Sequence, residues 1–139
     1  MCSAIEYQGR QIWFREPKVK LPVVRRDGTV GWCRWGLGFE ESHVYFHNGP
    51  SVGEHQLQEP GWQQLQPKPV RLAVDRYMIT DRQGKAQWFD IEPRSAMRGV
   101  LTTWQGELRV YILTERASTS RQLIRSQWPK FRTAMLEEA

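Results

Sequence analysis

The strongest folding signal in the chain is residues 21–39, LPVVRRDGTVGWCRWGLGF, which predict a β-hairpin. Asp27-Gly28 is the predicted turn, because a tight primed turn needs positive φ at its central residues and Asp and Gly tolerate this well. A β-branched run precedes the turn, and a second apolar run follows it and reaches Trp35-Gly36. Gly36 lets a second backbone or a ligand come close, since it has no side chain.

Glycine turns recur along the rest of the chain. Gln-Gly pairs place Gly9, Gly84 and Gly106 at three further predicted hairpin tips, each between short runs of strand-forming residues. Short, regularly spaced strands with such turns predict a mainly antiparallel sheet, built from hairpins or as a small barrel. Residues 51–69 lack this pattern and predict a long loop with one helical turn at 61–65.

The last part of the chain predicts helix. Thr119 and Gln122 fit a capping box, in which two side chains satisfy free backbone N–H groups at a helix start. This helix is expected to end near Gln127, because the residue before a proline avoids helical geometry, and Pro129 can open a last helix. The predicted fold class is therefore α+β, mainly antiparallel β-strands with C-terminal helices.

Length and charge limit the classes of protein. At 139 residues the chain suits a single domain, residues 1–139, with one core. No apolar run approaches the roughly 18 residues of a membrane span and no signal sequence is evident, so a soluble, cytoplasmic protein is expected. The protein is also expected to be a monomer. Lys and Arg number 20 and Asp and Glu 15, which gives a net charge of +5. This excess is compatible with nucleic-acid binding, but many basic domains bind nothing acidic.

The histidines do not predict a metal site. His43 and His47 are four residues apart on a predicted strand, which separates them by about 13 Å. His55 lies in the predicted loop, and no Cys or carboxylate spacing accompanies it to support zinc. The sequence also lacks a glycine-rich phosphate loop and a Gly-x-Ser-x-Gly motif. No metal and no cofactor are therefore predicted.

Cys2 offers a different chemistry because of its position. Removal of Met1 would expose an α-amine, with a pKa of about 7.7–8.0, beside a thiol with a pKa of about 8.5. Such an aminothiol condenses with an aldehyde: the amine forms an imine, and the thiol closes a five-membered thiazolidine ring. The thiol could instead act as an N-terminal nucleophile that cleaves a pro-segment. A third interpretation is that Cys2 is simply the second residue of the chain.

Several short motifs follow one another in a distinctive order along the whole chain. The Met-Cys start is followed by Pro-Val-Val at 22–24, Trp-Gly-Leu at 35–37 and Tyr-Ile-Leu-Thr at 111–114. This order resembles the SOS response-associated peptidase (SRAP) family, also called the abasic-site processing family. The stretch Ile-Arg-Ser-Gln-Trp-Pro at 124–129 lies where that family has an Ile-His-x-Arg-Met-Pro pattern.

The resemblance implies a compact, strand-rich fold with a basic groove for single-stranded DNA, in a DNA-damage protein of a bacterium or phage. In that family the protein removes its own Met, as an autopeptidase. The exposed Cys then captures the ring-opened sugar aldehyde of an abasic site as a thiazolidine crosslink. By resemblance, the catalytic residues are Cys2 and Asn48. The resemblance implies DNA contacts at Arg34, Trp35, Gly36, Leu37, Thr114 and Arg125.

The chain also departs from the family pattern at positions that carry chemistry. Pro50 stands where the family has a DNA-contacting arginine, and Ile79 stands where it has a glutamate. Arg125 and Gln127 replace a histidine and an arginine. The glutamate and histidine are the family's acid/base groups, and each such group contributes about 10²–10⁴-fold to a rate. Arg125 cannot shuttle a proton, although it can bind a phosphate.

The sequence leaves two classes of function open. It also leaves open whether the protein is an enzyme. The first is a SRAP-like protein that binds single-stranded DNA and captures abasic sites through Cys2. Its candidate base-stacking residues are Trp32, Trp35 and Trp62, and each stack is worth about 1–3 kcal/mol. This class predicts one cleft around Cys2, Trp35 and Asn48. The second is a catalytically inactive module that binds or inhibits a protein partner. Several arginines are predicted to lie on the same face as this cleft, from the set Arg34, Arg71, Arg98, Arg109 and Arg125.

Overall fold

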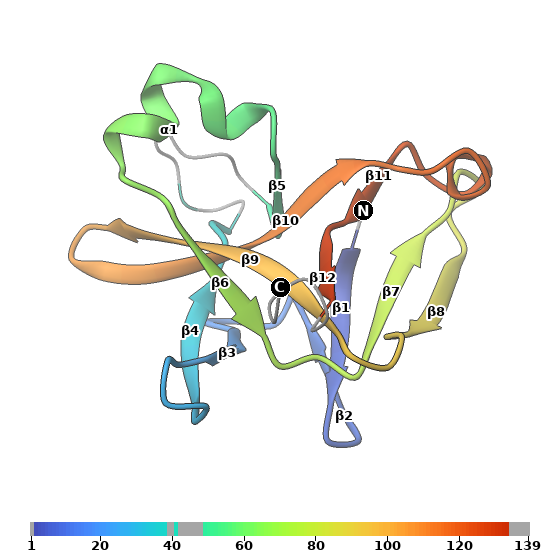
Figure 1. The fold of residues 1–139 in the computed structure, drawn as a ribbon, viewed down its shortest axis with the longest axis horizontal. Helices are drawn as coiled ribbons and strands as arrows, with labels where there is room; N and C mark the ends of the chain where they lie inside the picture. The colour runs from blue at the N-terminus through green and yellow to red at the C-terminus, as the bar shows by residue number, and fades with distance from the viewer. Residues whose placement is uncertain (1, 39–40, 42–48, 134–139) are drawn as a thin grey trace.

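The computed structural model of the chain describes residues 2–38, 41 and 49–133 (Figure 1). Strands make up 54% of it and helix only 9%. Within the described residues the helical part is one short helix, α1 (Pro60–Gln64), and two isolated 3-10 turns, η1 (Gln56–Gln58) and η2 (Arg121–Leu123). The prediction of an α+β fold is therefore wrong, and the protein belongs to the mainly β class.

Five strands close into a barrel. Their order around the ring is β10-β4-β3-β6-β9, and pairing of β9 with β10 completes it. β4 runs parallel to β10, and the other neighbours in the ring are antiparallel. Closure leaves these strands without the long free edges of an open sheet. The bounds are Lys20–Val24 for β3, Val30–Trp35 for β4, Lys68–Leu72 for β6, Ser95–Trp104 for β9 and Glu107–Arg116 for β10.

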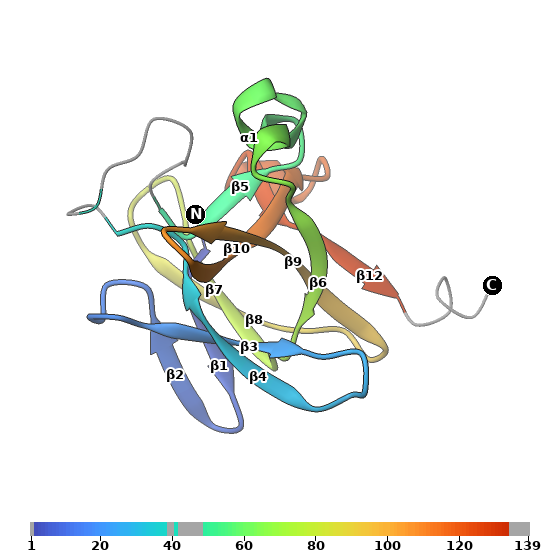
Figure 2. The same cartoon turned by 90° about the vertical axis from the view of Figure 1, so that its left-hand side faces the viewer.

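A four-stranded antiparallel sheet lies beside the barrel, in the order β2-β1-β7-β8 (Figure 2). Three short strands extend the barrel: β5 and β11 pair with β10, and β12 pairs with β9. The sheet strands are β1 (Cys2–Tyr7), β2 (Arg10–Trp13), β7 (Arg76–Thr80) and β8 (Ala86–Asp90). The short strands are β5 (Ser51–Gly53), β11 (Gln127–Pro129) and β12 (Phe131–Thr133).

All four predicted hairpins are confirmed. They join β1 to β2, β3 to β4, β7 to β8 and β9 to β10. The glycines at their tips have φ between +77° and +86°, a region that costs other residues about 1–2 kcal/mol. In the turn between β3 and β4, Asp27 Oδ1 accepts the backbone N–H of Thr29 at 3.0 Å. The tip glycines are Gly9, Gly28, Gly84 and Gly106.

Residues 51–69 are more regular than the predicted loop. They contain β5, η1, α1 and the start of β6. Helix α1 confirms the helical turn expected at 61–65. Trp62 on this helix is 3% exposed and packs edge-on against Tyr111 of β10, which attaches the segment to the barrel.

The predicted C-terminal helices are absent from the described residues, and that prediction is wrong. Thr119 and Gln122 form no capping box, because Gln122 Nε2 donates to the backbone O of Ala117 at 3.0 Å instead. After the single turn η2, the chain forms the strand β11. Trp128 on β11 is 1% exposed, and its Nε1 donates to Tyr77 Oη at 3.1 Å. Burial of this indole against the four-stranded sheet outweighs the local helical preference.

The larger of two core clusters joins the barrel to the four-stranded sheet and includes Ile5, Trp35, Ile79 and Trp128. Cys2 belongs to this cluster, so the N-terminal strand is anchored in the core. The smaller cluster gathers apolar residues of α1, β5 and the barrel. None of the helices within residues 2–38, 41 and 49–133 has the length and apolar character needed to cross a membrane.

Candidate functional site

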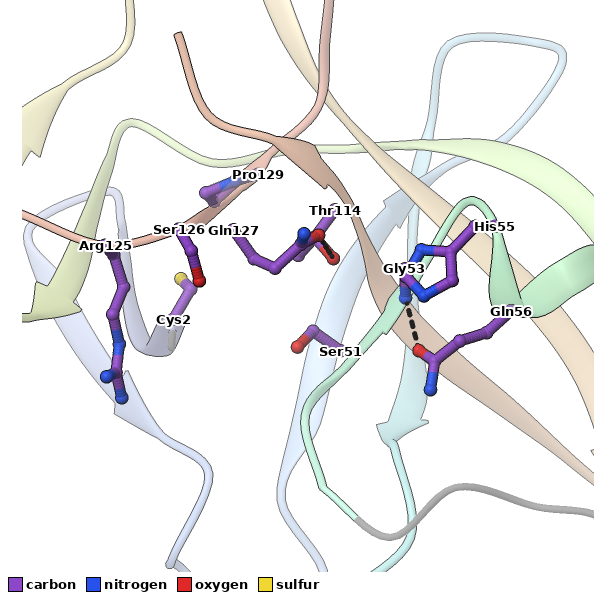
Figure 3. Close-up of a pocket in the computed structure, with 10 residues that line it drawn as sticks. All are labelled: Cys2, Ser51, Gly53, His55, Gln56, Thr114, Arg125, Ser126, Gln127 and Pro129. Carbon is purple, nitrogen blue, oxygen red and sulfur yellow. Dashed lines mark hydrogen bonds between the residues drawn. The ribbon is translucent and has the colours of Figure 1, made fainter. Parts of the chain in front are cut away.

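A cavity of about 330 Å³ opens where the start of β1 meets β5, β10 and the segment leading into β11 (Figure 3). Figure 3 shows Cys2, Arg125 and Ser126 toward one end and His55 and Gln56 toward the other. This volume is at the small end of the range for small-molecule sites. We call it the Cys2 pocket, defined by Cys2, Ser51, His55, Thr114, Arg125 and Gln127 among its lining residues.

Cys2 lies at the edge of this pocket and of the core. It is the first residue of β1, and its side chain is 1% exposed. The thiol donates to the backbone O of Ala4, with Sγ 3.6 Å from that oxygen. Burial raises the pKa of the Cys2 thiol to about 12, because the thiolate loses its hydration. At neutral pH the thiol is therefore protonated and weakly nucleophilic.

Ile79 of β7 is the cross-strand partner of Cys2 and is fully buried. This is the position at which the SRAP resemblance has a glutamate. An aliphatic side chain occupies it, and no Asp or Glu is among the described residues that line the Cys2 pocket. His55 is the one imidazole among them, and Figure 3 shows it at the far end of the pocket from Cys2. The described residues that line the pocket therefore offer no carboxylate for proton transfer at the thiol.

Thr114 and Arg125 are the other two predicted site residues that line the Cys2 pocket. Thr114 lies on β10, and its Oγ1 is 3.4 Å from Gln127 Oε1, to which it donates. Arg125 follows η2, and its backbone N donates to the backbone O of Arg121 at 3.0 Å. The η2 turn and β11 thus bring Arg125 to the pocket that Cys2 enters from β1. Three residues named from sequence motifs in distant parts of the chain line one cavity.

Trp35, Gly36 and Leu37 do not line the Cys2 pocket. Trp35 is 2% exposed, and its Nε1 donates to the backbone O of Pro50 at 2.9 Å. Leu37 is fully buried in the smaller core cluster. Gly36 has φ +59°, and a Cβ there would lie 2.1 Å from the backbone O of Gly49. The Trp-Gly-Leu motif therefore holds the chain that leads into β5, which supplies Ser51 to the pocket.

Arg34 belongs to an ionic cluster on the barrel. It lies 3.7 Å from Glu41 Oε1 and 3.5 Å from Glu107 Oε1. The guanidinium of Arg109, which is 4% exposed, donates to Glu41 Oε2 at 2.7 Å and to the backbone O of Gly36 at 3.0 Å. The hydrogen bonds from Arg109 to the Glu41 carboxylate lower the pKa of that carboxyl. Arg34 and Arg109 therefore form ion pairs on the barrel and do not line the Cys2 pocket.

The remaining candidates fall elsewhere. Asn48, His43 and His47 lie outside the described residues. Arg71 and Arg98 line a separate groove over β3, β6 and β9. Arg125 is therefore the one member of the predicted arginine set that lines the Cys2 pocket.

Among the candidate base-stacking residues only Trp32 is exposed. It is 44% exposed and meets Tyr7 edge-on, with 5.8 Å between ring centroids. Trp35 and Trp62 are buried. Trp32 is not among the residues that line the Cys2 pocket.

Sequence reasoning missed a second cavity beside the Cys2 pocket. Its volume is about 730 Å³, and Ser3, Trp13 and Phe14 are among its lining residues. Ser3 follows Cys2, and Pro50, which also lines this cavity, precedes Ser51 of the Cys2 pocket. The aromatic run at the end of the first hairpin was the available signal. Sequence reasoning also missed Ser51 and Gln127 as lining residues, since β5 and β11 were not predicted as strands.

Comparison with known proteins assigns no family to this chain. No family model matches it, and no curated protein matches it. Within the described residues, no group of three or more His, Cys, Asp or Glu side chains is placed to hold a metal ion.

Proposed function

We propose that this chain is a SRAP-like protein that binds single-stranded DNA at the Cys2 pocket. The observation that carries the proposal is the convergence of Cys2, Thr114 and Arg125 on one cavity. The SRAP resemblance implies these three residues independently of the fold, and they come from β1, β10 and the segment after η2. Neither Trp35 nor Arg34, which the resemblance also selects, adds to this support.

The polar side chains of the pocket suit one nucleotide of a DNA strand. Arg125 is half-buried, always cationic, and has a planar fork that matches two phosphate oxygens. The hydroxyls of Thr114 and Ser126 and the amide of Gln127 offer neutral hydrogen bonds to a sugar or a base. In this arrangement Arg125 holds a phosphate while the sugar attached to it enters the pocket.

Cys2 supplies the covalent step once Met1 is removed. The α-amine of Cys2 attacks the aldehyde carbon of a ring-opened abasic sugar, and loss of water gives an imine. Sγ then adds to the imine carbon, and the thiol proton passes to the nitrogen, which closes a thiazolidine without any oxidant. The raised thiol pKa slows this step, and so does the lack of a carboxylate among the described lining residues, since general acid–base help is worth about 10²–10⁴-fold per group. Capture is therefore slow.

A second candidate function is a catalytically inactive module that binds or inhibits a protein partner through the same surface. The observation that favours it is Ile79, which is fully buried opposite Cys2 at the position where the family has a glutamate. In this case the pocket retains its shape without its chemistry.

The test uses protein whose loss of Met1 has been verified by intact mass. It is incubated with a labelled DNA strand that carries one abasic site, and with the matched intact strand, and adducts are resolved on a denaturing gel. We expect a slow adduct on the abasic strand alone, which Cys2→Ala abolishes without changing reversible affinity. Arg125→Gln should weaken reversible binding to both strands, whereas Arg10→Gln, on the β1–β2 hairpin away from the pocket, should not.

Two results would overturn the proposal. The first is an adduct that survives in Cys2→Ala, because the N-terminal mechanism would then be wrong. The second is single-stranded DNA binding that is absent or unaffected by Arg125→Gln. Absent binding would favour the protein-partner function, whereas binding that Arg125→Gln leaves unchanged would assign DNA to another surface.

A further inference from the structure

We infer that a second site, separate from the Cys2 pocket, binds the phosphate backbone of a nucleic-acid strand. It is a groove of about 830 Å³ over β3, β6, β9 and β12. It shares no lining residue with the Cys2 pocket. We call it the arginine groove, defined by Arg25, Arg26, Lys68, Arg71, Arg98 and Arg132.

Strand pairing sets the arginines in a row. Arg71 of β6 lies opposite Arg98 of β9, and Val24 of β3 lies opposite Arg71 on its other side. Arg132 of β12 lies opposite Ala96, two residues before Arg98. Residues directly opposite each other, or two apart on one strand, share a face of a sheet, and adjacent strands lie about 4.8 Å apart. Three neighbouring strands therefore present Arg71, Arg98 and Arg132 on one face.

The groove concentrates the basic excess of the chain. Its six cationic side chains exceed the net charge of the whole chain, which is +5. Five of the six are exposed and Arg98 is half-buried. The described residues that line the groove include no Asp or Glu.

The chemistry of the groove fits a phosphodiester chain. Five of the six cations are arginines, whose planar forks match phosphate oxygens. No aromatic side chain is among the described lining residues, so bases cannot stack there, and aliphatic side chains such as Val70 and Leu101 can pack against sugars. Contacts of this kind position a strand without reading its sequence.

A membrane surface fits the groove less well. The charges line a hollow, whereas proteins that lie on membranes project large apolar side chains beside their cations. The large apolar side chains that are exposed in the described residues are Trp32, Leu108 and Leu123, and none of them lines the groove.

The inference stands independently of any chemistry at Cys2, although one strand can reach both sites. Pro129 lines the Cys2 pocket and Arg132 lines the groove, and three residues of chain span at most about 11 Å. The groove therefore adds a sequence-independent contact next to the pocket that receives a single nucleotide.

The test measures the affinity of the full chain for a labelled oligothymidine over a range of salt concentrations. The groove variant is Arg26→Gln/Arg98→Gln. The charge-matched control is Arg10→Gln/Arg94→Gln, whose residues line neither the groove nor the Cys2 pocket. Loss of two phosphate contacts should weaken binding roughly tenfold near physiological salt and reduce the log–log salt slope by about 1.4, whereas the control should change neither. Arg26→Lys/Arg98→Lys should retain most of the slope, because it keeps both charges.

The outcomes separate this site from the Cys2 pocket. If the proposed function fails and this inference holds, Arg125→Gln has no effect while the groove variant still weakens binding. Equal effects of the groove variant and its control would overturn the inference. Competition by polyglutamate as strong as that by oligothymidine would also overturn the inference, and would assign the groove to acidic peptides. Binding to vesicles of anionic lipid that depends on the groove, without any loss of oligothymidine binding, would assign it to membranes.

Discussion

Ile79 lies directly opposite Cys2 in the β1–β7 ladder, and both side chains are almost completely shielded from solvent. The cross-strand partner of Cys2 is therefore aliphatic, at the position where the SRAP resemblance has a glutamate. Burial raises the pKa of the Cys2 thiol, because the thiolate loses its hydration. If the proposed function holds, this pair predicts that capture at Cys2 is slow.

Replacing Ile79 should show how much chemistry this position controls. We expect Ile79→Glu to raise the rate of abasic-site capture by about 10²-fold or more, since the carboxyl group restores proton transfer at the thiol. Ile79→Gln is the matched control, because it buries a side chain of the same size without the acid. Both variants should lower the free energy of unfolding by about 1–3 kcal/mol through burial of a polar group. Equal capture rates in the two variants would show that position 79 does not limit the reaction.

The buried thiol should also make stability depend on alkaline pH. The pKa of Cys2 is about 12 in the folded protein and about 8.5 in an unfolded chain. The unfolded state therefore loses the thiol proton first, and stability falls as pH rises from about 8.5 toward 12. Cys2→Ala removes this contribution, so wild type should lose up to about 1.4 kcal/mol more per pH unit than the variant does. Parallel curves of unfolding free energy against pH would contradict the burial of the thiol.

Gly36 should be far less tolerant of a side chain than a hairpin glycine. Gly36→Ala should lower the free energy of unfolding by about 2–5 kcal/mol, because its φ is +59° and the new Cβ would lie 2.1 Å from the backbone O of Gly49. Gly106→Ala is the control: its φ is +79° but no atom lies within 4 Å of the new Cβ, so only about 1–2 kcal/mol is expected. Denaturant unfolding measures both. Similar losses for the two variants would mean that the close approach at Gly36 is not important.

Turn chemistry is local, and for that reason the hairpins could be predicted from sequence. Gly28 and its counterparts need positive φ whatever the rest of the chain does. The C-terminal segment is the opposite case. Its capping pattern around Thr119 is a weak local preference, and burial of Trp128 against Tyr77 decides that the chain extends into β11. Closure of the barrel through β9 and β10, and the parallel pairing of β4 with β10, are long-range features that no local pattern encodes.

The candidate site residues likewise divide into those that the sequence predicts and those that depend on long-range pairing. Cys2, Thr114 and Arg125 were named from motif order, and the structure brings them to one pocket. Trp35 was named in the same way, but it is buried and its indole N–H donates to the backbone O of Pro50. Ser51 and Gln127 could not be named, since their strands form only by pairing with β10, far away in sequence.

The most direct measurement is a map of backbone amide shifts when isotopically labelled protein is titrated with a short single-stranded DNA that carries one abasic site. Residues of the Cys2 pocket, among them Ser51, Thr114 and Gln127, should show the largest shifts, and Arg125→Gln should reduce them at a given DNA concentration. Shifts in the arginine groove should appear as the strand is lengthened. If the pocket amides stay unchanged while DNA is bound elsewhere, or if no amide shifts at all, the assignment of DNA binding to the Cys2 pocket is wrong.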